Sequence, residues 1–282
     1  MSCTQEEPLK HFNKTFGGHE LEIGSLYLAK STKKIPSSQD GGVVTCLLGY
    51  ALDEGIINGA VVAGKDRCWN AFPVIVTDSS ELKNYAGSIY FPIDSRDIRA
   101  NVRRAVDAYR DVGIVVTPCE LRVLCMGSNA VKPDEVYLKI GLFCLGSFNP
   151  EKFWSYIGND VKREDVKRFE IDRDLRLIDE EGRTVFRGPV GEAHKYSIPW
   201  CKKCHEYVPA AADLSVGAGP EKGICAVYLQ TQRGRDIFKK AYEDGVLVVA
   251  EVPAKFKERF EKIAKQKRSS AHISASAEYV LK

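Results

Sequence analysis

The chain has 282 residues, enough to bury one large hydrophobic core or two smaller ones. Hydrophobic residues make up 44% of it and charged residues 28%, which is typical of a folded globular protein and argues against disorder. The formal net charge is only +3, and basic residues are interspersed with acidic ones, so the composition predicts no binding to nucleic acid.

No apolar stretch reaches the ~18–20 residues that a helix needs to cross a bilayer. The chain does not open with a charged-then-apolar leader, so we expect a cytoplasmic protein with no membrane span. It has nine cysteines, an odd number, which in such a protein favours reduced thiols and metal ligands over a disulfide framework.

Strands and helices alternate through the first half of the chain. We expect an irregular N-terminal segment over 1–24 and then an α/β part over 25–112. The predicted elements are a strand over 21–29, a helix over 43–54, strands over 60–63 and 72–77, a short helix from 78–81 and a helix over 96–110. This order predicts an α/β core with a mixed sheet.

The second half mixes buried strands with half-exposed ones. We expect this part to cover 113–250. Buried strands should end at Cys119 and Cys144, and a helix should follow over 153–161. After these we expect half-exposed strands over 166–178, a hairpin turn at 180–183 with its returning strand at 184–187, a strand over 226–231 and a helix over 234–245. The mixed-sheet core is thus predicted to continue into a smaller α+β C-terminal part. A basic amphipathic helix over 255–267 and a tail should occupy 251–282, with the helix packed on the protein or on a partner.

Four cysteines lie in settings that suit metal ligands. Cys201 and Cys204 form a CxxC pair in a segment that otherwise reads as loop. Cys119 and Cys144 each end an apolar run that reads as a buried strand, and α/β proteins build their sites at the carboxyl ends of such strands. Four thiolates can hold a tetrahedral metal ion or an iron–sulfur cluster.

Other readings of the CxxC pair stay open. A thioredoxin-like pair usually opens a helix after a strand, and the loop character here disfavours it. Structural zinc more often takes two close cysteine pairs, so one pair with scattered single cysteines favours an iron–sulfur cluster, although the spacing does not exclude zinc. Cys125, six residues after Cys119, is an alternative ligand, whereas Cys46 lies in an apolar run and is expected in the core.

The segment 38–45, Ser-Gln-Asp-Gly-Gly-Val-Val-Thr, is a second candidate site. Gly41 and Gly42 let backbone N–H groups approach a phosphate, and the helix N-terminus that follows adds partial positive charge. Gln39 and Thr45 could hydrogen-bond the ligand. By itself the pattern is also that of a common turn. The chain lacks GxGxxG and GxxxxGK[ST], so neither a Rossmann nicotinamide site nor a phosphate-binding P-loop is predicted.

Four segments in order resemble the coenzyme F420 hydrogenase/dehydrogenase beta subunit family. They are the stretch 38–63, Thr-Pro-Cys-Glu-Leu-Arg at 117–122, Gly-Leu-Phe-Cys at 141–144 and His-Lys-Tyr-Ser-Ile-Pro-Trp-Cys-Lys-Lys-Cys-His-Glu-Tyr at 194–207, so the resemblance spans about residues 25–245. It implies one [4Fe–4S] cluster held by Cys119, Cys144, Cys201 and Cys204, next to FAD. It also implies a relay from the cluster through FAD, which exchanges a hydride with coenzyme F420.

The same resemblance assigns flavin contacts and partners. The expected FAD contacts are Lys30, Ser31, Thr32, Gln39, Asp40, Gly41, Gly42 and Thr45, with Gly87, Ser88 and Tyr90 lining the ring. His194 is expected either at the flavin edge or as an ordinary hydrogen-bonded surface histidine. The two-cluster ferredoxin domain of some relatives is missing, so electrons are expected from other subunits of a hydrogenase, formate dehydrogenase or related complex.

Two positions depart from the family pattern. Gly-Ser-Ile-Tyr at 87–90 replaces Gly-Thr-x-Tyr and keeps a hydroxyl, while the glycine-rich loop at 215–223 is shortened. The shortened loop favours an alternative, an electron-transfer subunit that keeps the cluster but does not use F420. A related reductase with a second cluster would need a further cysteine quartet. A zinc-stabilised binding module is the remaining alternative.

Overall fold

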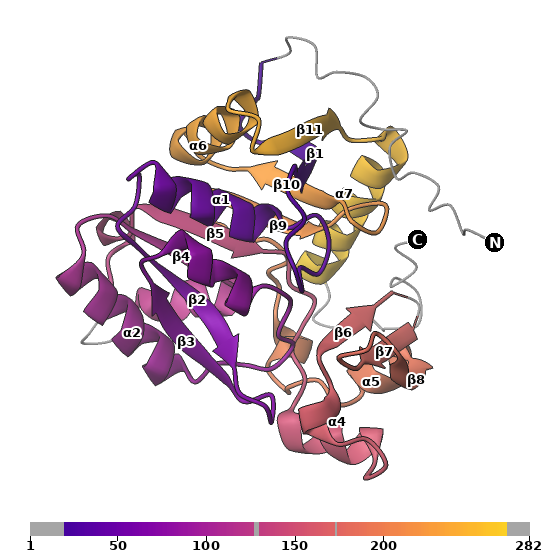
Figure 1. The fold of residues 1–282 in the computed structure, drawn as a ribbon. Helices are drawn as coiled ribbons and strands as arrows, with labels where there is room; N and C mark the ends of the chain where they lie inside the picture. The colour runs from indigo at the N-terminus through magenta and orange to yellow at the C-terminus, as the bar shows by residue number, and fades with distance from the viewer. Residues whose placement is uncertain (1–19, 127–129, 173, 270–282) are drawn as a thin grey trace.

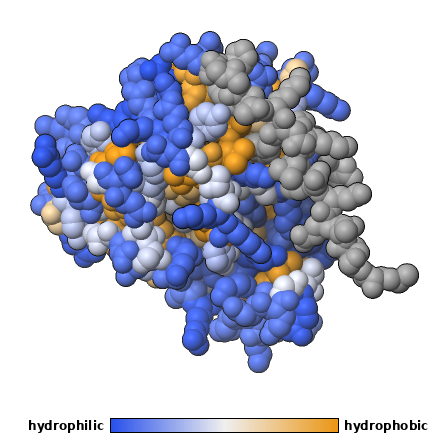
Figure 2. Space-filling model, turned by 45° about the horizontal axis from the view of Figure 1, so that its top comes forward, coloured by the Kyte–Doolittle hydropathy of each residue, from blue (hydrophilic) through white to orange (hydrophobic). Residues whose placement is uncertain are grey.

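The computed structural model describes residues 20–126, 130–172 and 174–269 (Figure 1). Most of the expected irregular segment 1–24 and the tail beyond residue 269 therefore lie outside the described residues. None of the described helices combines the length and the apolar character that crossing a bilayer requires. The face drawn in Figure 2 is mostly hydrophilic, with small separate hydrophobic patches.

Among the described residues, eight strands form one mixed sheet in the order β11-β1-β10-β9-β5-β4-β2-β3. These strands are β1 (Leu26–Ser31), β2 (Gly59–Lys65), β3 (Ala71–Val76), β4 (Val112–Val116), β5 (Leu138–Leu142), β9 (Leu214–Ala218), β10 (Cys225–Leu229) and β11 (Leu247–Glu251). The central strands β2, β4, β5 and β9 run parallel, and the remaining pairs are antiparallel. The predicted α/β core with a mixed sheet is confirmed.

The described residues also form seven α-helices and four 3-10 helices. They are α1 (Val43–Asp53), α2 (Ser95–Ala108), α3 (Pro118–Leu124), α4 (Pro150–Ile157), α5 (Val190–His194), α6 (Gln232–Glu243) and α7 (Ala254–Ser269), with 3-10 helices η1 (Ser79–Tyr85), η2 (Pro133–Glu135), η3 (Arg163–Asp165) and η4 (Cys201–Lys203). Helices α1 and α6 share a core with Ala60 and Val62 of β2, whereas α2 and α3 pack with Val61, which points to the opposite face. Helix α7 packs through Phe256 on Leu28 of β1.

A second, three-stranded antiparallel sheet lies beside the large one (Figure 1). It consists of β6 (Arg168–Ile171), β7 (Asp174–Ile178) and β8 (Thr184–Pro189). The β7–β8 pairing confirms the hairpin predicted at 180–183. Its core is aromatic: the ring centroid of Phe169 lies 4.2 Å from that of Trp69 and 5.6 Å from that of Phe153. This cluster fastens the small sheet to the loop after β2.

Several elements differ from those predicted. The first strand begins at Leu26 rather than at residue 21, because Gly24 turns the chain at φ +81°. The segment after 78–81 is a 3-10 helix, in which the Asp78 carboxylate accepts a hydrogen bond from the Ser80 N–H. Strands β9 and β11 were not predicted. Strand β9 contains serine and glycine, which have low strand propensity. Its pairing with β5 and β10 holds it in the extended conformation. Strand β1 pairs with β10 and β11, so the two expected parts 25–112 and 113–250 contribute to one sheet.

Candidate functional site

A cavity of about 360 Å³ lies at the carboxyl ends of the parallel strands. Its wall includes Ala63 of β2, Thr117 just after β4, Leu142 of β5 and Val216 of β9. Open α/β sheets bind ligands at this edge because the loops and helix N-termini that follow the strands converge there. The wall is predominantly apolar, and polar groups from distant segments of the chain enter it at a few points.

The glycine-rich turn forms one side of the cavity. Gln39, Asp40, Gly42 and Thr45 all contribute to the wall. Gly42 is the residue before α1 and has φ +70°, a conformation that glycine adopts without strain. The turn therefore delivers the N-terminus of an eleven-residue helix to the cavity, where the helix dipole favours an anionic ligand.

The other four residues expected to contact FAD are Lys30, Ser31, Thr32 and Gly41. They lie outside the cavity wall that the described residues form. Lys30 and Ser31 end β1, and the Thr32 hydroxyl donates to the carbonyl oxygens of Gly245 and Val246 at 3.0 Å. Gly41 sits where a Cβ atom would lie 2.9 Å from the Ala29 carbonyl oxygen, so it is needed for backbone packing. These residues therefore lie around the glycine-rich turn without lining the cavity.

The ring-side candidates Gly87, Ser88 and Tyr90 do line the cavity. Gly87 has φ +110° and leaves no room for a Cβ atom, which would lie 2.8 Å from the Ser37 carbonyl oxygen. Burial raises the pKa of Tyr90 to about 12, and Asp40 adds to the rise against a hydrogen bond from Ser88. Tyr90 is therefore an un-ionised aromatic wall residue.

His194 also lines the cavity and is half-buried rather than at the surface. Its Nδ1 atom lies 3.4 Å from the Ser197 hydroxyl, and its ring centroid lies 5.7 Å from that of Phe148. Burial lowers the pKa of His194 to about 4, so the imidazole is neutral at physiological pH. It can donate or accept a single hydrogen bond in the cavity without bringing in charge.

The four candidate cysteines come from three segments that meet beside the cavity. Cys119 is in the first turn of α3, Cys144 follows β5, Cys201 is the first residue of η4, and Cys204 directly follows η4. Burial raises the pKa of the Cys144 thiol to about 12, and the neighbouring Cys119 and Cys201 add to the rise. Cys204 likewise raises the pKa of Cys119 and of Cys201, in each case after the larger effect of burial. The four thiols therefore lie near one another.

Backbone groups support three of these sulfurs. The N–H groups of Glu120, Gly146 and Ser147 are directed at the sulfurs of Cys119, Cys144 and Cys201, respectively, and lower their pKa values against burial. Position 119 is fixed by a capping box: the Glu120 carboxylate accepts hydrogen bonds from the Thr117 N–H at 2.7 Å and from its hydroxyl at 2.8 Å. Hydrogen bonds to sulfur stabilise thiolates and help to set the potential of bound clusters.

By their chemistry, these four thiol donors suit either a thiolate-bound metal ion or an iron–sulfur cluster. Among the described residues, no three histidine, cysteine, aspartate or glutamate side chains are gathered closely enough to hold one ion. Cys125 is exposed and its sulfur donates to the Leu121 carbonyl oxygen at 3.6 Å, and Cys46 packs against the main core.

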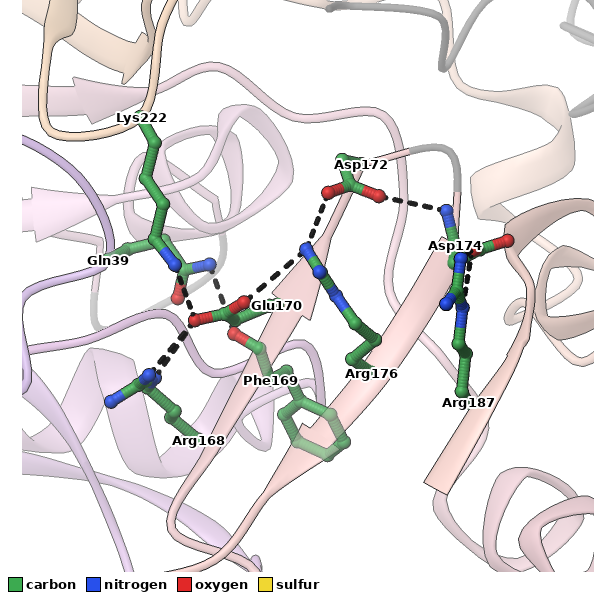
Figure 3. A network of polar contacts seen from close by, with 9 residues as sticks. All are labelled: Gln39, Arg168, Phe169, Glu170, Asp172, Asp174, Arg176, Arg187 and Lys222. Atoms are coloured by element: carbon green, nitrogen blue, oxygen red, sulfur yellow. Dashed lines mark hydrogen bonds and ion pairs between the residues drawn. The ribbon is translucent and has the colours of Figure 1, made fainter. Parts of the chain in front are cut away.

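A network of charged side chains, drawn in Figure 3, contributes Glu170, Arg176 and Lys222 to the cavity wall. Glu170, only 12% exposed, accepts from Lys222 Nζ at 2.8 Å, Arg168 Nη2 at 3.0 Å and Arg176 Nη2 at 3.3 Å. Nearby, Gln39 Nε2 donates to the Phe169 carbonyl oxygen at 3.0 Å. These contacts tie the small sheet to the glycine-rich turn and to the loop after β9.

Sequence reasoning missed the cavity residues of this network, Glu170, Asp172, Arg176 and Lys222. The alternation of charged and apolar residues at 166–178 indicated half-exposed strands. Nothing in that pattern showed which of the charged side chains line the cavity. It also left out Cys225, which lines the cavity with its sulfur against the N–H groups of Gly41, Gly42 and Val43; burial raises its pKa to about 12. A lone cysteine in an apolar strand carries no sequence signal for such a place.

Comparison with known proteins gives consistent matches. The family model for the N-terminal part of the coenzyme F420 hydrogenase/dehydrogenase beta subunit matches residues 26–97, and that for its C terminus matches residues 109–255. The coenzyme F420 hydrogenase subunit beta of Methanothermobacter thermautotrophicus is 34% identical over 224 residues, which are 74% of this chain and 77% of the relative. The corresponding subunit of Methanosarcina barkeri is 30% identical over 236 residues, 77% of this chain and 78% of the relative.

A solved structure has a similar fold. A chain of the F420-reducing [NiFe] hydrogenase complex from Methanosarcina barkeri superposes with a TM-score of 0.79 at 27% sequence identity. The superposition covers 89% of this chain and 91% of that chain. The similarity therefore extends over most of both chains.

Proposed function

Because the chain belongs to the coenzyme F420 hydrogenase/dehydrogenase beta subunit family, we propose that it is an oxidoreductase subunit that relays electrons between one [4Fe–4S] cluster, FAD and coenzyme F420. It would work within a hydrogenase, formate dehydrogenase or related complex. The observation that carries this proposal is that Cys144 lines the same cavity as Gly42 and Gly87. The cavity wall thus contains a candidate cluster ligand, Cys144, together with the turn at Gly42, which suits a phosphate, and the turn at Gly87, which suits an aromatic ring.

When bound, the cluster would supply one-electron transfer, and the flavin would supply hydride exchange with the deazaflavin ring of F420. The residues of the chain bind and orient these groups. The α1 N-terminus at Gly42 would hold the pyrophosphate, and the apolar wall with Tyr90 would cover the ring and exclude water. The amide N–H groups of Gly146 and Ser147 would stabilise the cluster thiolates.

A partner subunit would reach the cluster at the CxxC turn. Trp200, which precedes Cys201, is 64% exposed, and Lys202 and Lys203 are exposed beside it. Exposed tryptophan is common at protein interfaces because it offers apolar area and one hydrogen-bond donor. Helix α7 is less suited to docking, since its apolar residues Phe256 and Ile263 are already buried.

The competing proposal is an electron-transfer subunit that does not use F420. The shortened segment 215–223 favours it, because the loop after β9 brings Lys222 into the cavity wall, where Lys222 pairs with Glu170. Both proposals require the cluster and FAD, so they differ only in the acceptor. A zinc-stabilised module would need neither.

The experiment that tests the proposed cofactors is anaerobic purification followed by a visible spectrum with iron, sulfide and flavin analysis. We expect flavin bands on a broad iron–sulfur absorption, with one FAD and one cluster per chain. A colourless protein that contains zinc in place of iron would reject the proposal and favour the binding module. A protein that contains the cluster but no flavin would reject the assignment of the cavity as the FAD site.

A further inference from the structure

Helix α7 carries a buried lysine beside the candidate cluster ligands. Lys267 is only 3% exposed, and its Nζ atom donates to the Cys144 carbonyl oxygen. The end of the helix is held there by a second contact, since His205 Nδ1 lies 3.1 Å from the Arg268 carbonyl oxygen. His205 follows Cys204 directly, so α7 ends against the CxxC turn. The family models match no further than residue 255, and Lys267 lies beyond them.

The burial of Lys267 follows from its position on the helix. Arg259, Ile263 and Lys267 are spaced four residues apart and therefore lie on one face. That face packs inward, where Ile263 is buried and the Phe260 ring centroid lies 5.6 Å from that of Tyr207. The other lysines of α7, such as Lys265, are exposed. Lys267 is thus buried because it lies on the same face of α7 as Ile263.

A buried ammonium group is costly unless a negative charge compensates it. Among the residues that the structure describes, no carboxylate lies within salt-bridge distance of Lys267, and the Cys144 carbonyl offers only a dipole. The group that it contacts belongs to a candidate cluster ligand, because its Nζ atom lies against the carbonyl oxygen of Cys144. The available place for a compensating anion is therefore the space between the four cysteines.

We propose that Lys267 is a positioning residue that balances the negative charge of a cluster ligated by four thiolates and raises its reduction potential. This inference rests on the cluster of the proposed function. One-electron reduction adds a negative charge to the cluster, and a buried cation beside Cys144 stabilises that charge more than it stabilises the oxidised form. The chain thereby eases electron entry into the cluster from the partner subunit.

The test is a redox titration of the cluster by electron paramagnetic resonance, with the anaerobic holoprotein and three variants. Lys267→Met removes the charge at similar length, Lys267→Arg keeps it, and Lys265→Met removes an exposed charge from the same helix as the matched control. We expect Lys267→Met to lower the equilibrium constant for reduction roughly tenfold, ~59 mV for one electron, while the other two variants titrate like the wild type.

An unchanged potential in an iron-containing Lys267→Met protein would overturn the inference and leave the proposed function standing. An equal shift in Lys265→Met would also overturn it, because a general surface effect would then suffice. If Lys267→Met folds but loses iron, Lys267→Arg decides: iron retained in the arginine variant supports charge compensation, and iron lost in both assigns Lys267 to packing. A wild-type protein without iron would reject the cluster itself.

Discussion

Serine in place of Cys144 is expected to remove most of the iron from the protein. Cys144 lines the cavity, and burial raises the pKa of its thiol, to which Cys119 and Cys201 add. Metal ions and clusters hold such a thiolate in its ionised form, whereas a serine hydroxyl remains protonated at neutral pH and binds iron poorly. Three remaining thiolates would leave one iron exposed to loss.

The measurement is the iron and sulfide content of the anaerobically purified variant, with circular dichroism as a check on folding. Cys125→Ser and Cys225→Ser are the controls, because Cys125 is exposed and Cys225 lies against the glycine-rich turn. Both should keep the iron of the wild type. Full iron in Cys144→Ser, or its loss in Cys125→Ser alone, would mean that a different set of ligands holds the cluster.

A large aromatic residue at position 218 should prevent flavin binding without disturbing the fold. Ala218 ends β9 two residues after Val216, so the two side chains lie on the same face of the strand, and both residues line the cavity. Ala218 is exposed, so a larger side chain can be accommodated in the absence of ligand. In Ala218→Trp the indole would occupy space that the flavin needs, and we expect FAD affinity to fall about tenfold or more, ~1.4 kcal/mol.

The matched control for this substitution is Ala211→Trp. Ala211 is also exposed but lies outside the cavity wall formed by the described residues. Flavin titration of the apoprotein, followed by fluorescence, compares the two variants with the wild type. Equal affinity in all three proteins would place the flavin elsewhere. Weakened binding in both variants would indicate a general loss of structure.

The features predicted best from sequence are those with local signals. Helix α1 was expected at 43–54 and occurs at Val43–Asp53, because apolar residues recur at helical spacing and Gly55 ends the pattern. Cys119, Cys144, Cys201 and Cys204 were chosen as one ligand set from strand ends and the CxxC motif, and this set stays a prediction. Cys119 follows β4 and Cys144 follows β5, and these two strands are neighbours in the sheet. The carboxyl ends of neighbouring parallel strands meet at one edge of a sheet, which makes this kind of convergence predictable.

The features missed depend on tertiary packing. Lys267 is one of several lysines in a basic helix, and nothing in the sequence distinguishes the buried one from the exposed ones. Glu170 and Lys222 are 52 residues apart, and their pairing depends on where the small sheet lies beside the large one. Lys30, Ser31 and Thr32 were expected at the flavin; they lie outside the cavity wall that the described residues form, and their contact with FAD stays a prediction.

The acceptor is the centre of the functional proposal, and one assay addresses it directly. The purified subunit, loaded with FAD and its cluster, would be mixed anaerobically with reduced viologen and F420, and the F420 absorbance followed. We predict loss of that absorbance, since hydride transfer needs only the reduced flavin and an adjacent pocket for the deazaflavin. Unchanged F420 in the presence of fully reduced FAD would contradict the account and favour an electron-transfer subunit with a different acceptor.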